Sequence, residues 1–491
     1  MMRCSTLTSL LLATALAWAL AATPANAEPA ADDVLALDNV HIVEAEHNRV
    51  SVRRCVRVQG TRIATITAAG EPACLRGAGA VDLQGRYLMP GMIDMHAHLT
   101  LGPLEIRREG EGVVMQALPD DDIAEHNARR LVAFGVTTIR DPGGDLAAAG
   151  RYKARLAAGE LVGPESFHAG PVINNAELPG LATAARSAED MERVVRAQVQ
   201  AGADWIKLYT GLSPELLKAG IDAAHRQGRP TVAHLDNIAW TDALAMGLDG
   251  IVHLMPLSPD LLTPEQRAAW QATARGGTFS FFEWWEHFDP EGAQADRLVA
   301  AFGQHRPVFD ATLVAFHAAF VQDRDNPYKD DARRHAHPRL LAHWNEWFTF
   351  AIGWEPDDFQ RARAVWPKVQ RMAARLYSTD ARLTLGTDMS NPWIAPGISL
   401  HREMQLLAEA GVPTARLLLA ATRTAAEALG AGQRLGQVAP GFEADLLVLD
   451  GNPLDDIRHT RQIHAVVLDG SLLTTTELNQ LTSGIGSGGA K

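Results

Sequence analysis

Residues 90–98 read PGMIDMHAH, an apolar, strand-like run that ends in two histidines one residue apart, His96 and His98. Because successive side chains of a strand point to opposite faces, the two imidazoles project to the same side and can share a cation. The spacing alone is a weak signal, since a second pair, His335 and His337, lies in a polar segment where we expect solvated side chains. The first pair predicts half of a metal site, and the other ligands must come from elsewhere in the chain.

Seven further runs have the length and composition of strands. They are residues 136–141, 166–170, 204–209, 230–234, 250–253, 307–313 and 383–388. Helix-like stretches such as 187–201, 214–227 and 241–246 separate several of them, so strands alternate with helices as βα units and favour a parallel sheet. Together with residues 90–98, the candidates number about eight, the count that closes a (β/α)8 barrel. The sequence therefore predicts an α/β fold with a distorted (β/α)8 TIM barrel.

Ligand-type residues lie at or next to the ends of these runs. Besides His96 and His98, they are Lys207, His234, His253 and Asp388. The carboxyl ends of the strands form the active face of such a barrel, so these side chains are expected to converge there. Neutral imidazoles suit zinc and neighbouring divalent metals. An ammonium cannot ligate a metal, so Lys207 must be modified or deprotonated, which burial favours. An ion pair of Lys207 with Asp204 or Asp388 is the structural alternative.

The order of these residues resembles the amidohydrolase superfamily, the metal-dependent hydrolases built on a distorted barrel. The matching pattern is His-x-His on the first strand, Lys on the fourth, His on the fifth and sixth, and Asp on the eighth. In this chain the pattern falls on His96, His98, Lys207, His234, His253 and Asp388. The phrases GMIDMHAHL, GVTTIRDPGG, DWIKLYTG, GTDMSNP and PGISLHREMQLLAEAGVP are most similar to the imidazolonepropionase and prolidase-like branch.

The resemblance implies two divalent metal ions bridged by a carbamylated Lys207, with zinc as the first candidate and manganese, cobalt or nickel as others. Such a pair would hold a bridging hydroxide and polarise a substrate carbonyl. Asp388 would ligate one metal, take the proton of the hydroxide and return it to the leaving nitrogen. The implied reaction is hydrolysis of C–N amide bonds in dipeptides, N-acyl amino acids or aryl amides. A lactonase, carbamate hydrolase or phosphotriesterase with the same centre is the main alternative, and a non-catalytic scaffold is a remote one.

Residues near the active face are candidates for binding a small-molecule substrate. They are Tyr209, His168, Arg140, Asn391 and Trp393. Tyr209 and His168, at strand ends, can polarise a carbonyl or hold a carboxylate, and packing behind the ligands is equally compatible with their positions. Arg140 suits a bidentate carboxylate clamp, although the adjacent Asp141 favours a structural ion pair. Asn391 and Trp393 follow Asp388 and are expected to line the pocket.

Two longer segments are rich in aromatic residues. Residues 278–288, TFSFFEWWEHF, predict either a lid or pocket wall that suits aromatic substrates, or a helix whose aromatic face packs against the barrel exterior. Residues 335–366 carry Trp344, Trp347, Trp354 and Trp366, and they are expected to shape the entrance or an oligomer surface. A homo-oligomer is therefore left open.

The first 27 residues have the pattern of a secretory signal. Arg3 precedes an apolar core, and residues 25–27 read Ala-Asn-Ala, an A-x-A cleavage site. A transmembrane anchor is the alternative, but the apolar stretch is shorter than the ~20 residues that a span needs. We expect an exported protein, periplasmic or secreted, without a stable membrane anchor after cleavage. In an oxidising compartment Cys55 and Cys74 can form a disulfide.

Short antiparallel strands are expected in residues 28–90 and again in residues 433–478, which resemble the second β segment of the superfamily. In relatives such segments build one small β-sandwich, so residues 91–432 are predicted to form a barrel inserted into that domain. Residues 479–491 are rich in Gly and Ser and are predicted to be a flexible tail. The formal net charge of −13 argues against nucleic acid as a partner, because nucleic-acid binders usually display a basic surface.

Overall fold

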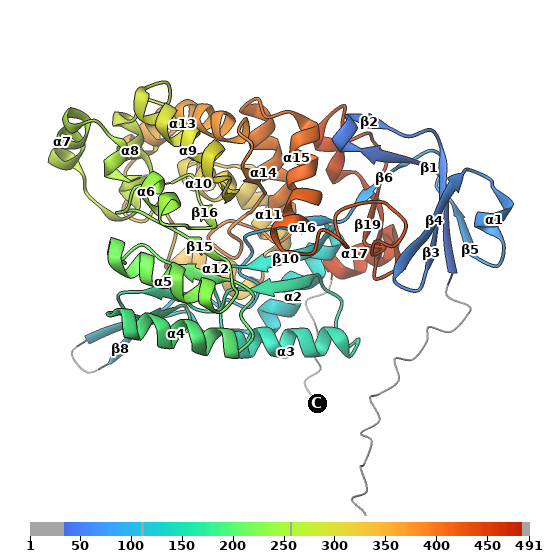
Figure 1. Ribbon diagram of the computed structural model, residues 1–491, viewed down its shortest axis with the longest axis horizontal. Coiled ribbons are helices and arrows are strands. Elements are labelled where there is room, and N and C mark those ends of the chain that lie inside the picture. Colours follow the sequence, from blue (N-terminus) through green and yellow to red (C-terminus); the bar gives the residue numbers. More distant parts are fainter. Residues whose placement is uncertain (1–33, 110–111, 256–257, 484–491) are drawn as a thin grey trace, which may run out of the picture.

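The computed structural model describes residues 34–109, 112–255 and 258–483 of the 491-residue chain. These ranges form an α/β protein in which a β-rich unit, at the right of Figure 1, lies beside a larger unit of parallel strands covered by helices. Within these ranges, none of the helices is both long and apolar enough to cross a bilayer. The predicted signal sequence, residues 1–27, lies outside the described residues.

The β-rich unit contains a nine-stranded sheet that both ends of the chain build together. Its strands are β1 (Val34–Glu44), β2 (Arg49–Val50), β3 (Arg54–Gln59), β4 (Arg62–Ala68), β5 (Gly79–Asp82), β6 (Tyr87–Pro90), β19 (Leu446–Leu449), β20 (Ile463–Leu468) and β21 (Ser471–Thr474). The β1–β3 register shifts between Leu37 and Val40, and beyond this point β1 pairs with β6 through His41 and Ile42. Buried aliphatic side chains from both chain ends, Leu37 and Val448 among them, share one core.

A disulfide joins Cys55 on β3 to Cys74 on the short helix α1 (Pro72–Leu75). The prediction that these two cysteines can pair is confirmed. Both side chains are fully buried and pack against Ala36 of β1, so the bond ties α1 to the sheet.

The larger unit contains two sheets in which the strands of every paired neighbour run parallel. One has the order β11-β10-β7 and the other β13-β12-β14-β15-β16-β17-β18. The strands are β7 (Met92–Asp94), β10 (Val136–Asp141), β11 (Glu165–His168), β12 (Val172–Asn174), β13 (Ala182–Ala184), β14 (Ile206–Leu208), β15 (Thr231–Ala233), β16 (Gly250–Val252), β17 (Val308–Asp310) and β18 (Arg382–Leu383). Each region in which the sequence predicted a parallel strand contains one. We did not expect β12 and β13, because each is only three residues long and follows a Gly- and Pro-containing turn.

Backbone hydrogen bonds connect the two parallel sheets at both of their edges. Beyond β7, the N–H of Met95 donates to the carbonyl of Leu385 at 2.8 Å, and the segment after β18 thereby joins the first sheet. On the other side, the N–H of Asp204 donates to the carbonyl of His168 at 2.7 Å, which joins β11 to the approach of β14. The parallel strands therefore follow one another around a curled arrangement.

Amphipathic helices alternate with many of these strands, as predicted. They are α2 (Asp121–Ala133), α3 (Leu146–Ala157), α4 (Ala188–Gln200), α5 (Pro214–Arg226), α6 (Trp240–Ala245), α9 (Ala293–His305), α13 (Pro356–Tyr377) and α14 (Ile398–Glu409). Side-chain caps define several of the starts. The carboxylate of Asp120 accepts backbone N–H groups at the start of α2, and the hydroxyls of Ser187 and Ser213 do so for α4 and α5.

The described ranges also contain a hairpin, further helices and 3₁₀ turns. They are the hairpin strands β8 (Glu105–Glu109) and β9 (Gly112–Gln116), the helices α7 (Pro264–Thr273), α8 (Ser280–His287), α10 (Leu313–Phe320), α11 (Pro327–His335), α12 (Pro338–Glu346), α15 (Thr414–Ala420) and α16 (Arg423–Ala428), and the 3₁₀ turns η1 (Ala45–His47), η2 (Pro259–Leu261), η3 (Gly277–Phe279) and η4 (Ile457–Arg461). The aromatic residues of segment 278–288 lie largely on α8. Its Phe282, Trp284 and Trp285 are fully buried, so these three side chains pack within the protein. A lid or pocket wall that contacts substrate stays a prediction. Trp347, after α12, is 70% exposed.

The C-terminal end differs from the sequence prediction. Helix α17 (Thr475–Ser483) includes residues 479–483, which we assigned to a flexible tail. The guanidinium of Arg130 on α2 donates to the carbonyl of Thr482 at 2.9 Å, and this contact anchors the last turn of the helix. The remainder of the predicted tail, residues 484–491, lies outside the described residues.

His335 and His337 are half-buried, so the expectation of a solvated pair was wrong. The His335 ring contacts Phe134 with centroids 4.9 Å apart, and the His337 ring contacts His126 at 5.0 Å. His337 also caps α12, since its Nδ1 accepts the N–H of Arg339 at 3.2 Å. The pair lies at the junction of two helices, where packing explains both residues.

Candidate metal centre

The six predicted ligands come together at the carboxyl ends of the parallel strands. His96 and His98 follow β7, Lys207 lies on β14, His234 follows β15, His253 follows β16 and Asp388 follows β18. Five of them are at most 8% exposed, and the side chain of His234 is 16% exposed. Ring centroids lie 5.3 Å apart for His98 and His96, 4.5 Å apart for His96 and His253, and 4.5 Å apart for His253 and His234. The four imidazoles therefore form one continuous row.

The tightest group within this row is His96, His98 and Asp388. The Oδ1 atom of Asp388 lies 3.2 Å from Nε2 of His98 and 3.4 Å from Nε2 of His96. One potential ligand atom from each residue lies within 4.8 Å of the other two. The segments are also bonded directly, because the N–H of Asp388 donates to the carbonyl of His96 at 2.7 Å. These three residues can hold one cation.

The Nδ1 atoms of three histidines are already occupied by protein partners. His96 Nδ1 lies 2.9 Å from Oδ1 of Asp310, and His98 Nδ1 lies 2.8 Å from the carbonyl of Gly143. His253 Nδ1 lies 2.8 Å from the hydroxyl of Thr312. Partners of this kind fix the orientation of an imidazole and leave Nε2 to bind a metal. The arrangement is typical of ligating histidines.

The electrostatics of the centre differ along the row. Burial, together with nearby cationic groups, lowers the pKa of His96 and of His253 well below its usual range, so these imidazoles are in the neutral form that ligates metals. At His98 burial also acts to lower the pKa, but the carboxylates of Asp141 and Asp388 outweigh it and raise the pKa to about 10. This end of the row therefore attracts positive charge. Burial lowers the pKa of Lys207 to about 7, so a fraction of its amine is neutral near neutral pH.

The buried Nε2 atom of His234 makes no hydrogen bond within the described part of the chain. A buried polar atom without a partner costs about 1–3 kcal/mol, which favours a ligand role over a packing role. The ring itself is fixed edge-on between Tyr209, with centroids 5.1 Å apart, and His253. Four imidazoles, one amine and one carboxylate form a donor set that fits zinc or a similar divalent ion.

Asp94 and Gly386 bring the ligand-bearing segments together. The carboxylate of Asp94 accepts the N–H groups of His96 and Thr387 at 3.0 and 3.1 Å, and the Thr387 hydroxyl at 2.7 Å. A Cβ at position 386 would lie 2.6 Å from Cβ of His96 and 2.9 Å from Oδ1 of Asp310. Only glycine allows this approach without movement of a neighbour.

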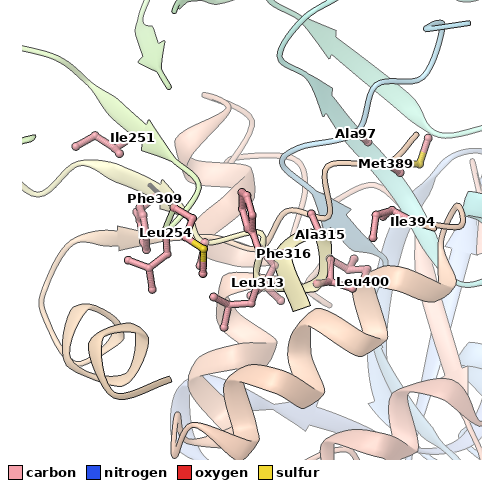
Figure 2. Close-up of a cluster of buried hydrophobic side chains, with 14 of the residues drawn as sticks. Ala97, Ile251, Leu254, Phe309, Leu313, Ala315, Phe316, Met389, Ile394 and Leu400 are labelled. Carbon is pink, nitrogen blue, oxygen red and sulfur yellow. The ribbon is translucent and has the colours of Figure 1, made fainter. Parts of the chain in front are cut away.

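Figure 2 shows a cluster of buried apolar side chains, some of which neighbour or contact the ligands. Ala97, Leu254 and Met389 of this cluster are the immediate chain neighbours of ligating residues. The ring of Phe316 on α10 contacts the ring of His253, with centroids 5.9 Å apart. Because such surroundings lower the local dielectric, charge–charge interactions at the centre are stronger than they would be in water.

Lys207 does not form the ion pair with Asp204 that was considered as an alternative. Asp204 instead accepts the ammonium of Lys153 at 3.2 Å and the N–H of His168 at 2.9 Å. Asp388 is close enough to affect the pKa of Lys207, which places the amine and the carboxylate in one site.

Of the predicted substrate-binding residues, Tyr209 is placed most suitably. Tyr209 follows Lys207 by two residues, so its side chain projects from the same side of the chain, and it is half-buried against His234. Burial raises the pKa of its hydroxyl, and the carboxylates of Asp388 and Asp236 add to this effect. The hydroxyl therefore stays protonated and can donate a hydrogen bond at the centre.

His168 is only 3% exposed, and its polar atoms face the protein. Its Nε2 is hydrogen-bonded to the Ser166 hydroxyl at 2.9 Å, and its Nδ1 lies 3.8 Å from Asp141. The same Asp141 carboxylate accepts the N–H groups of Leu99 and Gly143, each at 3.1 Å. These contacts favour the packing role for His168.

The prediction for Arg140 needs correction in its partner and its role. Its guanidinium is fully buried and donates to Oδ2 of Asp310 at 2.7 Å and to the carbonyl of Met95 at 2.8 Å. The expected pairing with Asp141 does not occur, because consecutive strand residues point to opposite faces. With no exposed surface, the Arg140 side chain is structural and does not reach a substrate carboxylate.

Asn391 and Trp393 shape the loop that follows Asp388. The Asn391 side-chain amide and its backbone N–H both donate to the carbonyl of Asp388, at 3.0 and 3.1 Å. Trp393 is 6% exposed, and its ring contacts Trp344 with centroids 6.1 Å apart. The structure shows both residues supporting this loop, and contact with a substrate stays a prediction.

The polar residues behind the ligands were not predicted from the sequence. Asp310 ends β17 in the same way that the ligands end other strands, and this signal was available in the sequence. Asp94 was visible within the decisive stretch 90–98 but was not assigned a role. Thr312 and the carbonyl of Gly143 carry no sequence signal, since each acts through a tertiary contact.

Comparisons with known proteins agree with this picture. Residues 302–473 match the model of the amidohydrolase family. The chain is similar to an imidazolonepropionase of Stenotrophomonas maltophilia, with 29% identity over 126 residues that cover 21% of this chain and 31% of that protein. Among solved structures, it is similar to a bottromycin amidohydrolase, with a TM-score of 0.66 and 23% identity over 91% of this chain and 89% of the other. It is also similar to a Xaa-Pro dipeptidase with methionine bound in the active site, with a TM-score of 0.64 and 18% identity over 90% of this chain and 100% of the other.

The fold and the site define an α/β protein with a buried cluster of potential metal ligands at the strand ends. The family match over residues 302–473 and the similarity to imidazolonepropionases support an amidohydrolase superfamily member of this branch, as the motifs predicted. The two structural similarities are below 25% identity and establish the fold alone. The match spans 31% of the length of the imidazolonepropionase, so it does not transfer that enzyme's activity to this chain.

Proposed function

We propose that this protein hydrolyses the C–N amide bond of small molecules such as dipeptides, N-acyl amino acids or aryl amides, with two divalent metal ions as cofactors. The observation that carries the proposal is the row of four imidazoles with Lys207 and Asp388 at one end of the parallel strands. The match of residues 302–473 to the amidohydrolase family and the likeness to a Xaa-Pro dipeptidase support an amide as the bond that is cleaved.

In this proposal His96, His98 and Asp388 hold one ion, His234 and His253 hold the other, and carbamylated Lys207 serves both. Zinc is the first candidate, and manganese, cobalt and nickel suit the same donors. When bound, the two ions supply a water of lowered pKa and polarise the substrate carbonyl.

The chain's own residues supply the proton transfers and the modification. Asp388 takes the proton of the attacking water and returns it to the leaving nitrogen. Tyr209, which is half-buried and has a protonated hydroxyl, orients the substrate. A neutral amine reacts with carbon dioxide by forming an N–C bond and losing a proton, and the pKa of about 7 makes this amine accessible at Lys207.

We further propose that the parallel strands form a distorted (β/α)8 barrel and that residues 28–90 and 433–478 form a β-sandwich beside it. The hydrogen bonds at both edges of the parallel sheets support the first statement, and the core shared by the two chain ends supports the second. Export to the periplasm or the medium is proposed from residues 1–27, and a disulfide between Cys55 and Cys74 is compatible with it. No nucleic-acid partner is proposed.

The test is a mass-spectrometric screen of the protein loaded with zinc or manganese in bicarbonate buffer. The substrates are dipeptides, N-acyl amino acids, aryl amides, lactones and a phosphotriester. Asp388→Asn should reduce turnover by at least about 10²-fold, the scale of a lost general base. Asp380→Asn, which changes an exposed aspartate in the same region, is the matched control and should leave turnover unchanged.

Release of free amino acids or amines that depends on Asp388 supports the proposal. Activity confined to lactones or phosphotriesters would favour the alternative reactions of the same centre, and equal turnover by Asp388→Asn would refute the role of that residue. Carbon-13 NMR of protein loaded with labelled bicarbonate should show a carbamate signal that is lost in Lys207→Ala.

A further inference from the structure

Asp236 lies two residues beyond His234, in the segment that follows β15. Its Oδ1 atom is 3.2 Å from Nε2 of His234. Both atoms are buried, and neither makes a hydrogen bond within the described ranges. They are close, but they are not aligned to donate and accept with each other. A buried polar atom without a hydrogen-bond partner costs about 1–3 kcal/mol. Two such atoms close together therefore favour a third group that binds both.

The separation of the two atoms fits a shared metal ion. Donors about 2.1 Å from a tetrahedral ion stand about 3.4 Å apart. The predicted ligand pairs of the other half of the centre have this spacing, with 3.2 Å between His98 Nε2 and Asp388 Oδ1 and 3.4 Å between His96 Nε2 and the same oxygen. His234 and Asp236, at 3.2 Å, repeat the geometry.

The surroundings of Asp236 place it at the centre. The ring of Tyr209, two residues after Lys207, contacts the ring of His234 with centroids 5.1 Å apart, and Asp236 lies against Nε2 of the same histidine. The side chain of Asp236 is 36% exposed as a whole, so solvent reaches the carboxylate even though its Oδ1 atom is buried beside His234.

The two halves of the row also differ in their carboxylates and in the hydrogen-bond partners of their histidines. Asp388 serves the half that contains His96 and His98, whereas the predicted ligands of the half that contains His234 and His253 include no aspartate or glutamate. In addition, His234 lacks a protein partner for Nδ1 among the described residues, unlike the other three histidines. A carboxylate at Asp236 gives this half the anionic donor that Asp388 gives the first.

We propose that Asp236 is a seventh ligand of the metal centre and binds the ion held by His234 and His253. This inference rests on the proposed binuclear site. Each ion then has one aspartate among its ligands.

The test compares Asp236→Asn with Asp242→Asn, which removes an exposed carboxylate six residues further along the chain. Zinc content is measured at buffered free zinc after loading with bicarbonate. The unaltered protein and Asp242→Asn should hold two zinc ions per chain. Asp236→Asn should hold one tightly and bind the second at least ten-fold more weakly. Cobalt-substituted Asp236→Asn should show an altered visible spectrum, and Asp236→His, which restores a donor, should recover the second ion.

Two equivalents of zinc with unchanged affinity in Asp236→Asn would overturn the inference. A raised KM for amine-bearing substrates with unaltered metal content would also overturn it and assign Asp236 to the substrate. If the unaltered protein binds no metal after loading, the binuclear site itself fails, and the proposed function fails with it. These outcomes separate the seventh ligand from the function on which it depends.

Discussion

Replacing Asp310 with asparagine should damage the stability of the protein and its metal affinity through two different contacts. Asp310 is fully buried, and one carboxylate oxygen lies 2.7 Å from Nη2 of Arg140 while the other lies 2.9 Å from Nδ1 of His96. Asparagine keeps the size of the side chain but removes its charge, so the buried guanidinium loses its counter-ion. Breaking a buried ion pair in this way costs about 3–5 kcal/mol.

The assay is urea unfolding of metal-free protein, which reports on the ion pair without a contribution from bound metal. Asp323→Asn is the matched control, because Asp323 pairs with Arg363 at 2.8 Å but both side chains are partly exposed. Pairs of this kind contribute about 0–1 kcal/mol. If Asp310→Asn lowers the free energy of unfolding no more than Asp323→Asn does, the reasoning about the buried pair is wrong.

A double variant separates the two roles of Asp310. Asp310→Asn with Arg140→Met removes the unpaired cation as well, so much of the lost stability should return. Metal affinity should stay about 10–100-fold below that of the unaltered protein, because His96 still lacks the carboxylate that orients its ring. Recovery of both properties would show that Asp310 acts on the centre only through Arg140.

Three further outcomes are expected. Burial lowers the pKa of His401 to about 3 in the folded protein, so its imidazole stays neutral there, whereas in the unfolded chain, with a pKa near 6.5, it gains a proton as the pH falls. This residue should therefore lower the free energy of unfolding by about 2 kcal/mol between pH 7 and pH 5. His401→Gln should reduce the pH dependence of urea unfolding by that amount. Gly386→Ala should lower both the melting temperature and the metal content, because the added Cβ collides with His96. The control Gly150→Ala, at an open position on α3, should stabilise the protein by up to about 1 kcal/mol. Replacing Cys55 and Cys74 with alanine should destabilise the fold by about 3 kcal/mol, seen as a lower melting temperature that no longer responds to reductant.

The local signals in the sequence identified the strands and the ligands at their ends. His96 and His98 were found because a strand of alternating faces gives a fixed two-residue spacing, and Lys207 because it sits inside an otherwise apolar run. The pairing of Arg140 with Asp310 was missed because the two residues are 170 positions apart. The pleat of the strand already argued against the pairing with Asp141, so that part of the error was avoidable.

The layer behind the ligands depends on contacts that sequence order does not reveal. Glu403 on α14 is fully buried, and its carboxylate accepts the N–H groups of Leu313 and Val314 at the start of α10, at 3.0 and 2.7 Å. The preceding residue, Thr312, holds Nδ1 of His253. A carboxylate about ninety residues downstream thus fixes the helix start that orients one ligand, and burial raises its pKa to about 8. Because the same carboxyl has a pKa near 4.5 in the unfolded chain, it lowers the stability of the folded state as the pH rises from about 4.5 to about 8. Its contacts at the start of α10 indicate that this destabilisation is tolerated because the group keeps His253 in place.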